Sequence, residues 1–153
     1  MVDDLTSRII GAAIEVHSVL GPGLLESAYE QCMAEEMKSR QLIFERQVPL
    51  PVVYKGCALD CGYRLDFVVN REVVLELKAI DKLLPIHEAQ VLTYLRLGSW
   101  HVGLLINFNV PLLRDGLKRI VHNYTDTPPS SPSGRGVAVG THDIPSRIYP
   151  RGS

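Results

Sequence analysis

The sequence predicts an α/β fold in which helices cover a mixed β-sheet. Two strand-like segments meet in residues 63–79, where apolar residues alternate with other residues at the period of two that strands show. A helix-like segment at 85–97 separates this hairpin from an apolar run at 102–107 that suits a buried strand. A helix between two strands of one sheet makes a crossover, and crossovers join parallel strands. The expected element order is helix, helix, three strands, helix, strand, helix (ααβββαβα).

Two helices are expected ahead of the first strand. Apolar residues recur at helical spacing over 5–20, with Asp4 or Thr6 available as the N-cap. The Gly-Pro-Gly segment at 21–23 ends this helix, and a second helix follows over about 24–40. Each has an apolar face, so we expect both to pack on the sheet.

Glu26 and Tyr29 share one face of the second helix, with Glu26 in the first turn and Tyr29 one turn later. On the residues alone, Glu26 is a carboxylate that interacts with the helix dipole, and this interaction stabilises the helix by about 0.3 to 1 kcal/mol. Tyr29 is then an ordinary core aromatic. Neither position on its own indicates a function.

The strands begin with a segment that prolines confine to an edge. Residues 43–54 are strand-like, although Pro49 and Pro51 make part of the segment an edge or a bulge. A Lys-Gly turn at 55–56 leads into a strand over 58–69. The central hairpin follows directly.

The central hairpin is expected to place two acids side by side. Its turn falls at residues 70–71, and a three-residue loop would set Asp66 opposite Glu76 with Cβ atoms roughly 5 Å apart. Lys78 lies on the same face. A slip of one residue would move one polar set to the other face, so the structure can refute this register.

Two carboxylates and a lysine on an otherwise apolar hairpin need compensation if they are buried. An unpaired buried carboxylate costs several kcal/mol. A divalent cation such as Mg²⁺ or Mn²⁺ supplies that compensation, and a lysine beside it can polarise a water or stabilise charge on a phosphate. The alternative is a solvated face with an ordinary Glu-Lys pair.

Two further helices are expected after the hairpin. A proline opens the helix over 85–97, on which Gln90 and Tyr94 share one stripe with His87. The apolar stripe of the same helix should face the sheet. A closing amphipathic helix is expected over 111–121.

Composition divides the chain at about residue 124. Residues 5–124 show the periodicities of one folded domain. Residues 125–153 hold half of the ten prolines and little apolar periodicity. We expect this Pro/Ser/Gly-rich tail to be disordered.

Composition also favours a cytoplasmic, water-soluble protein. The net charge is −1, so no overall field draws the chain onto nucleic acid or an anionic membrane, and any such contact must be a local patch. We find no secretory signal pattern and no apolar run near the roughly 18 residues of a spanning helix. Three cysteines, Cys32, Cys57 and Cys61, fit a reducing compartment better than a disulfide framework.

Three motifs of the chain resemble those of a known nuclease superfamily. Asp66, followed after nine residues by Glu-Leu-Lys at 76–78, resembles the core of the PD-(D/E)XK superfamily, whose fold is restriction-endonuclease-like, with Leu at the loose position before the Asp. The segment QVLTY at 90–94 resembles the QxxxY element of the RecB-like branch. Residues 23–29 match the pattern of the small GxxExxY family, which is assigned to the same superfamily. The resemblance spans about residues 5–124.

The resemblance implies a metal site. Asp66 and Glu76 correspond to ligands of Mg²⁺ or Mn²⁺, joined by the backbone carbonyl of Leu77. Glu26 resembles the additional acid that reaches the metal in many of these folds. Three carboxylates and one lysine sum to a charge of −2, which one divalent ion neutralises.

The resemblance also implies a reaction. Lys78 corresponds to the residue that orients or activates the attacking water, or neutralises the scissile phosphate. Gln90 and Tyr94 correspond to residues that line the site and hold the lysine or the substrate. The implied function is a metal-dependent phosphodiesterase acting on nucleic acid. The alternative is a nuclease-like fold that serves as a non-catalytic binding or regulatory module. Near-neutral charge and small size favour the module, and the intact acid-acid-lysine set favours the enzyme. DNA or RNA as substrate and the oligomeric state stay open.

Overall fold

A computed structural model of the protein describes residues 1–124, so the expected tail at 125–153 lies outside the described residues. The elements are α1 (Val2–Leu20), α2 (Glu26–Ser39), β1 (Phe44–Pro49), β2 (Val52–Tyr54), β3 (Cys57–Leu59), β4 (Arg64–Val69), β5 (Val73–Lys78), α3 (Pro85–Gly98), β6 (Val102–Asn107), the 3₁₀ helix η1 (Leu113–Gly116) and β7 (Leu117–Val121).

The centre of the fold is a five-stranded mixed sheet in the order β1-β4-β5-β6-β7. β5 and β6 are parallel and α3 forms the crossover between them, whereas the other neighbouring strands are antiparallel. Pro49 does fall on an edge, because β1 pairs on one side only within the described residues, whereas Pro51 lies between β1 and β2. The expected mixed α/β fold is confirmed.

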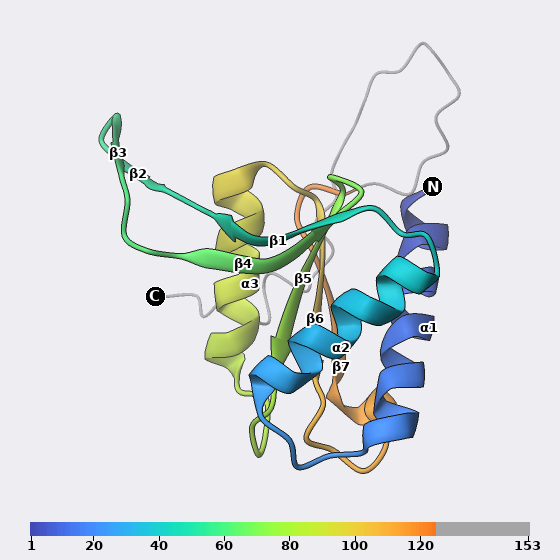
Figure 1. The fold of residues 1–153 in the computed structure, drawn as a ribbon. Coiled ribbons are helices and arrows are strands. Elements are labelled where there is room, and N and C mark those ends of the chain that lie inside the picture. The colour runs from blue at the N-terminus through green and yellow to red at the C-terminus, as the bar shows by residue number, and fades with distance from the viewer. Residues whose placement is uncertain (125–153) are drawn as a thin grey trace.

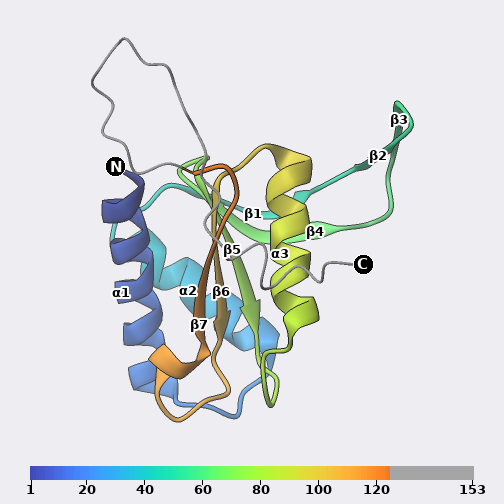
Figure 2. The same ribbon diagram turned by 180° about the vertical axis from the view of Figure 1, so that it is seen from behind.

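Helices cover both faces of the sheet (Figures 1 and 2). Phe67 and Leu75 pack in a core with residues of α1 and α2, whereas Val68 and Val74 pack in a second core with residues of α3. Neighbouring residues of one strand therefore pack into opposite cores, because successive side chains of a strand point to opposite faces of the sheet. This alternation fixes the face on which each polar residue of the hairpin emerges.

The closing helix expected over 111–121 is wrong. Only Leu113–Gly116 is helical, as one 3₁₀ turn, and the next five residues form β7, which pairs antiparallel with β6. Periodicity cannot separate a helix from a strand over so short an apolar segment. β7 covers an edge of β6 whose backbone groups would otherwise lack partners, so long-range pairing decides the outcome.

The helix starts are partly as expected. Pro85 is the first residue of α3, and α2 begins two residues later than expected. α1 begins at residue 2, and neither Asp4 nor Thr6 caps it. The hydroxyl of Thr6 donates instead to the carbonyl of Asp3 at 2.9 Å.

Residues 51–63, which we call the arm, extend away from the sheet beyond α3 (Figures 1 and 2). The two long strands expected on either side of the Lys-Gly turn each divide, so that β2 and β3 form a separate two-stranded ribbon. Lys55 and Gly56 form the expected turn, with φ of 50° and 80°. Both values are in the left-handed region, as in the type I′ turns that join two-residue hairpins.

Candidate active site

The β4–β5 hairpin carries its two acids in the expected register. The strands pair around a loop of residues 70–72, which is the expected length. In this register Asp66 lies opposite Glu76, one position beyond the last ladder pair. The backbone N–H of Leu77 donates to Asp66 Oδ2 at 2.8 Å, which ties the two strands together at the acids.

Both carboxylates are buried. Asp66 is 9% exposed and Glu76 is 8% exposed. Glu76 Oε2 lies 3.9 Å from Lys78 Nζ, whereas Glu76 Oε1 is buried with no hydrogen-bond partner in the described part of the chain. A solvated Glu-Lys face is therefore wrong, and one carboxylate oxygen is buried without the compensation that such a group requires.

Burial raises the pKa of both acids. The pKa of Glu76 rises from 4.5 to about 8, because burial and then the charge of Asp66 disfavour its ionised form, while Lys78 opposes the rise. The pKa of Asp66 rises from 3.8 to about 6, again mainly through burial, although the N–H of Leu77 lowers it. At neutral pH the pair therefore carries about one proton when no cation is present.

The end of β5 that carries Lys78 is fixed from the neighbouring strand. Phe108 N–H donates to the Lys78 carbonyl at 2.9 Å. The buried side chain of Asn107 accepts from Ile80 N–H at 3.0 Å and donates to Ile80 carbonyl at 2.9 Å. Lys78 therefore projects from a rigid strand end. The side chain of Leu77 is fully buried in the core, so only its backbone can serve the site.

α3 brings Tyr94 to the pair. Burial raises the pKa of the Tyr94 phenol to about 12, and the nearby charge of Glu76 adds to the rise. The phenol is thus protonated at neutral pH and can donate a hydrogen bond. Gln90 lies one turn earlier and is exposed. His87 has a structural role instead, because its Nδ1 accepts from Leu84 N–H at 2.9 Å at the start of α3.

α2 brings acidic charge to the same place. The charge of Glu26 raises the pKa of Asp66 and of Glu76, so the exposed first residue of α2 borders the pair. Within residues 1–124, however, no three His, Cys, Asp or Glu side chains lie close enough to hold a metal ion together. The structure therefore brings Asp66, Glu76 and Lys78 together and leaves Glu26 at the margin.

Glu30 of α2 is a further charged neighbour of the acid pair, and no sequence motif indicated it. Its charge raises the pKa of Asp66 more than that of Glu26 does. Its Oε2 accepts from Arg46 Nη2 at 3.2 Å and from Gln47 Nε2 at 2.9 Å. Gln47 stands opposite Asp66 in the β1–β4 register, where its φ of 51° interrupts the ladder. The spacing of Glu30 four residues after Glu26 is the signal that could have indicated it.

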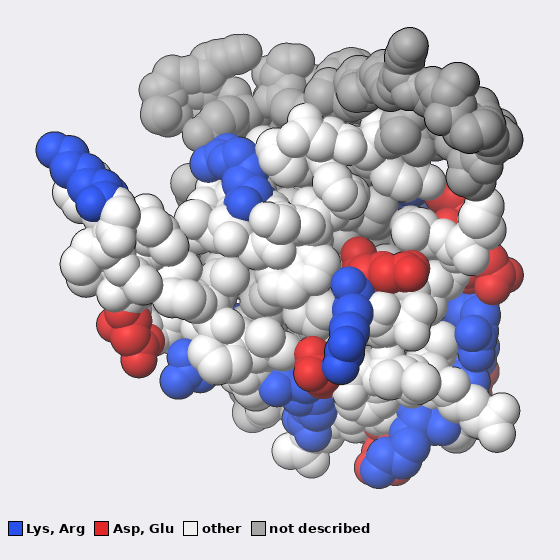
Figure 3. All heavy atoms as spheres, turned by 90° about the horizontal axis from the view of Figure 1, so that it is seen from above, with Lys and Arg blue, Asp and Glu red and all other residues white. Residues whose placement is uncertain are grey.

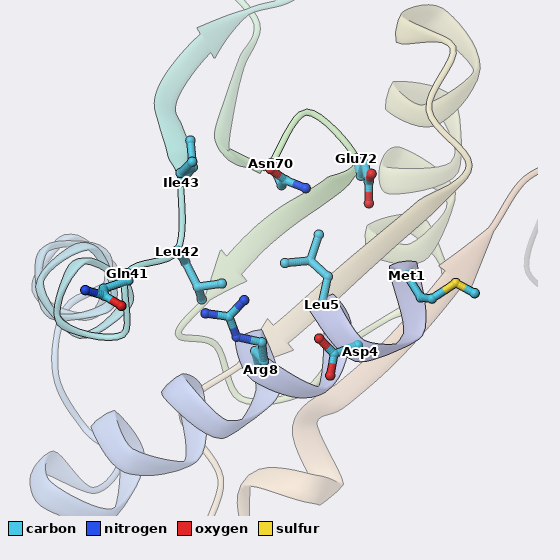
Figure 4. Close-up of a pocket in the computed structure, with 9 residues that line it drawn as sticks. All are labelled: Met1, Asp4, Leu5, Arg8, Gln41, Leu42, Ile43, Asn70 and Glu72. Atoms are coloured by element: carbon cyan, nitrogen blue, oxygen red, sulfur yellow. The ribbon is translucent and has the colours of Figure 1, made fainter.

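Two hollows elsewhere do not coincide with this site. One of about 220 Å³ lies between the start of α1 and the β4–β5 turn, and Figure 4 shows Asp4 and Arg8 from α1 with Asn70 and Glu72 from the turn. The Arg8 guanidinium donates to the Arg40 carbonyl at 3.0 Å and is thus engaged within the fold. A groove of about 550 Å³ runs between α1 and α2. Neither hollow is lined by a residue of the acid pair.

Comparison with protein families decides the relationship. The family described as the PD-(D/E)XK nuclease superfamily matches residues 3–120. The chain belongs to the PD-(D/E)XK nuclease superfamily. Comparison with curated proteins and with solved structures gave no match. Membership agrees with the observed fold. In the described part, no helix has the length and apolar character needed to span a membrane.

The residues of the pair suit the divalent metal that nucleases of this superfamily generally use. Asp66 and Glu76 offer carboxylate oxygens, the ligands that Mg²⁺ and Mn²⁺ prefer. Glu76 Oε1 is buried and unpartnered among residues 1–124, and a cation would satisfy it. A cation would also favour the ionised forms that burial now disfavours.

Proposed function

We propose that this chain is a Mg²⁺- or Mn²⁺-dependent phosphodiesterase that hydrolyses nucleic acid. The observation that carries the proposal is the buried Asp66–Glu76 pair, in which one oxygen has no partner among residues 1–124 and Lys78 lies beside the other. A buried acid pair with this energetic cost persists where function requires it. Membership of the nuclease superfamily supports the same conclusion.

Asp66 and Glu76 hold the ion in this proposal, with the Leu77 carbonyl as a third ligand and Glu26 as an additional acid at the margin. When bound, the ion supplies Lewis acidity toward a phosphate and makes water nucleophilic at neutral pH. Ionisation of Glu76 accompanies binding, because its pKa lies near 8 without a cation.

The remaining site residues act on the substrate. The ammonium of Lys78 lies 3.9 Å from Glu76 Oε2, where it can orient the attacking water or neutralise charge on the scissile phosphate. The protonated phenol of Tyr94 donates a hydrogen bond to a phosphate oxygen or a water. Gln90, exposed one turn away on α3, lines the site with its amide.

We further propose that the chain belongs to the GxxExxY family and carries a RecB-like QxxxY element. Each residue of the first motif has a physical role that supports this. Gly23 has a φ of 102°, which favours glycine. Glu26 borders the acids, and the Tyr29 hydroxyl accepts from Leu24 N–H at 3.2 Å and donates to the Gly21 carbonyl at 2.5 Å.

A second function, a non-catalytic binding or regulatory module, is favoured by one observation. The exposed carboxylate of Glu26 adds negative charge to that of the acid pair, and this charge repels a phosphate. Such a module would keep the site for a cationic ligand or a protein partner.

In either case we place the protein in the cytoplasm, which the three free thiols Cys32, Cys57 and Cys61 favour.

Cleavage assays with labelled single- and double-stranded DNA and RNA test the enzyme. The parent should cut at least one of these in Mn²⁺ or Mg²⁺, and Glu76→Gln and Lys78→Met should lose cleavage by at least 100-fold, as expected for removal of one strong electrostatic group. Lys118→Met, at an exposed lysine of β7, is the matched control and should cut like the parent. Equal cleavage by Glu76→Gln and the parent would contradict the proposal. Metal-dependent ligand binding with no cleavage of any substrate would favour the module.

A further inference from the structure

The arm exposes apolar and aromatic side chains without a core of its own. Every residue from 53 to 64 is exposed. Val53 is 58% exposed, Tyr54 61%, Leu59 42% and Tyr63 46%. A two-stranded ribbon of three-residue strands is marginal in water, so a surface of this kind indicates a partner.

The base of the arm adjoins the acid pair. Leu50 N–H donates to the Tyr63 carbonyl at 3.0 Å and closes the base onto the sheet. The ring of Tyr63 lies 6.3 Å from the ring of Tyr94 at an angle of 55°. The arm leads directly into β4, and Asp66 lies three residues after Tyr63 on that strand.

The charges of the arm suit a polyanion. Lys55 Nζ lies over the ring of Tyr54, 5.4 Å from its centroid, and Arg64 is exposed at the base. In the view from above, a basic side chain projects from the far end of the arm (Figure 3). The one acid of the arm, Asp60, accepts from Gly62 N–H at 3.0 Å. The arm therefore presents aromatic rings beside cations.

Rings beside cations match one class of nucleic acid. The bases of a single strand can stack on exposed aromatic side chains while its phosphates contact lysine and arginine. The bases of a duplex already stack on each other, which leaves no face for Tyr54 or Tyr63. We propose that the arm binds single-stranded nucleic acid and leads it to the Asp66–Glu76 pair. The claim that the bound strand leads to the acid pair rests on the proposed nuclease function. Binding of the strand to the arm can be measured without cleavage.

Fluorescence anisotropy of labelled 20-nucleotide single strands of DNA and RNA, measured in EDTA so that no metal-dependent cleavage occurs, tests the arm. The parent should bind at least one single strand more tightly than the matching duplex. Tyr54→Thr, which keeps a residue suited to strands, should weaken single-strand binding about tenfold. Tyr54→Phe, which keeps the ring, should bind like the parent.

A second variant removes charge without disturbing the turn. Lys55→Asn creates Asn-Gly, a preferred pair for the type I′ turn, so the ribbon should stay formed. We expect binding to fall by about two- to fivefold and to depend less on salt. Lys118→Asn removes the same charge from β7, at the far side of the sheet from β1, and should have no such effect.

Several outcomes would overturn the inference. Equal binding of single strand and duplex by the parent, no binding of either, or parent-like binding by Tyr54→Thr would each do so. Sedimentation velocity provides a further test: a dimer of the parent that Tyr54→Thr dissociates would assign the arm to a second copy of the chain. If the arm binds single strands but the parent cleaves no substrate, the nuclease proposal is refuted and the proposed role of the arm stands. If the parent cleaves nucleic acid and the arm variants cleave and bind like the parent, the proposed role of the arm is refuted and the nuclease proposal stands.

Discussion

Replacing Glu76 by Gln should stabilise the protein at alkaline pH. The folded chain holds the pKa of this carboxyl near 8, against 4.5 for an ordinary glutamate, because of burial and then the charge of Asp66. Between these pH values the folded state binds more protons than the unfolded state. The free energy of unfolding must therefore fall as pH rises from about 4.5 to about 8.

The size of this fall follows from the pKa difference. At about 1.4 kcal/mol per pKa unit, ionising Glu76 inside the fold costs on the order of 5 kcal/mol. Domains of this size are stable by roughly 5 to 15 kcal/mol, so the loss is a large fraction of the total. Gln fills the same space without ionising, so the free energy of unfolding of the variant should no longer fall above pH 6. Below pH 6 it should still fall with rising pH, because the pKa of Asp66 is raised to about 6.

Urea unfolding in EDTA at pH 5 to 9, followed through the single tryptophan, Trp100, measures this directly, because Trp100 packs against the core under α3. Glu35→Gln is the control, since Glu35 is exposed on α2 and pairs only with the exposed Lys38 among the described residues. A parent whose free energy of unfolding is flat or rising above pH 6 would refute the burial of an uncompensated carboxylate. A parallel decline in Glu76→Gln would do the same.

Two further changes have defined outcomes. Tyr29→Phe removes a hydroxyl that both accepts from Leu24 N–H and donates to the Gly21 carbonyl, so urea unfolding should show a loss of about 1 to 3 kcal/mol, and a loss under 0.5 kcal/mol would show that these hydrogen bonds add nothing. Glu30→Gln removes a negative charge beside Asp66, so the pKa of Asp66, followed by NMR of its carboxyl carbon, should fall below its value near 6. Glu35→Gln should leave that pKa in place, and an unchanged pKa in Glu30→Gln would mean that Glu30 does not face the acid pair.

The hairpin could be predicted because its determinants are local. Alternation along residues 63–79 and a loop of fixed length set the register that places Asp66 opposite Glu76. Pro85 likewise fixes the start of α3 by its own backbone geometry. The structure of such elements is determined by residues within the element or next to it.

The remaining features depend on contacts between distant segments. β7 is a strand because β6 offers it an edge, and its five residues alone do not distinguish a strand from a helix. Glu30 belongs to the site because Arg46 and Gln47 of β1 lie against α2. Cores on both faces of the sheet turn the polar hairpin residues inward, and this explains why a face that could be solvated is buried.

The most direct test of the metal site is calorimetric titration of Mn²⁺ into the parent and into Glu76→Gln at pH 7, in two buffers of different ionisation enthalpy. The parent should bind a saturating amount of Mn²⁺ and release up to one proton per ion, because the pKa of Glu76 lies near 8 without a cation. Glu76→Gln, shown to be folded by its urea transition, should bind at least tenfold more weakly and release fewer protons. Equal binding by the two proteins, or no binding by the parent, would contradict a metal site at the Asp66–Glu76 pair.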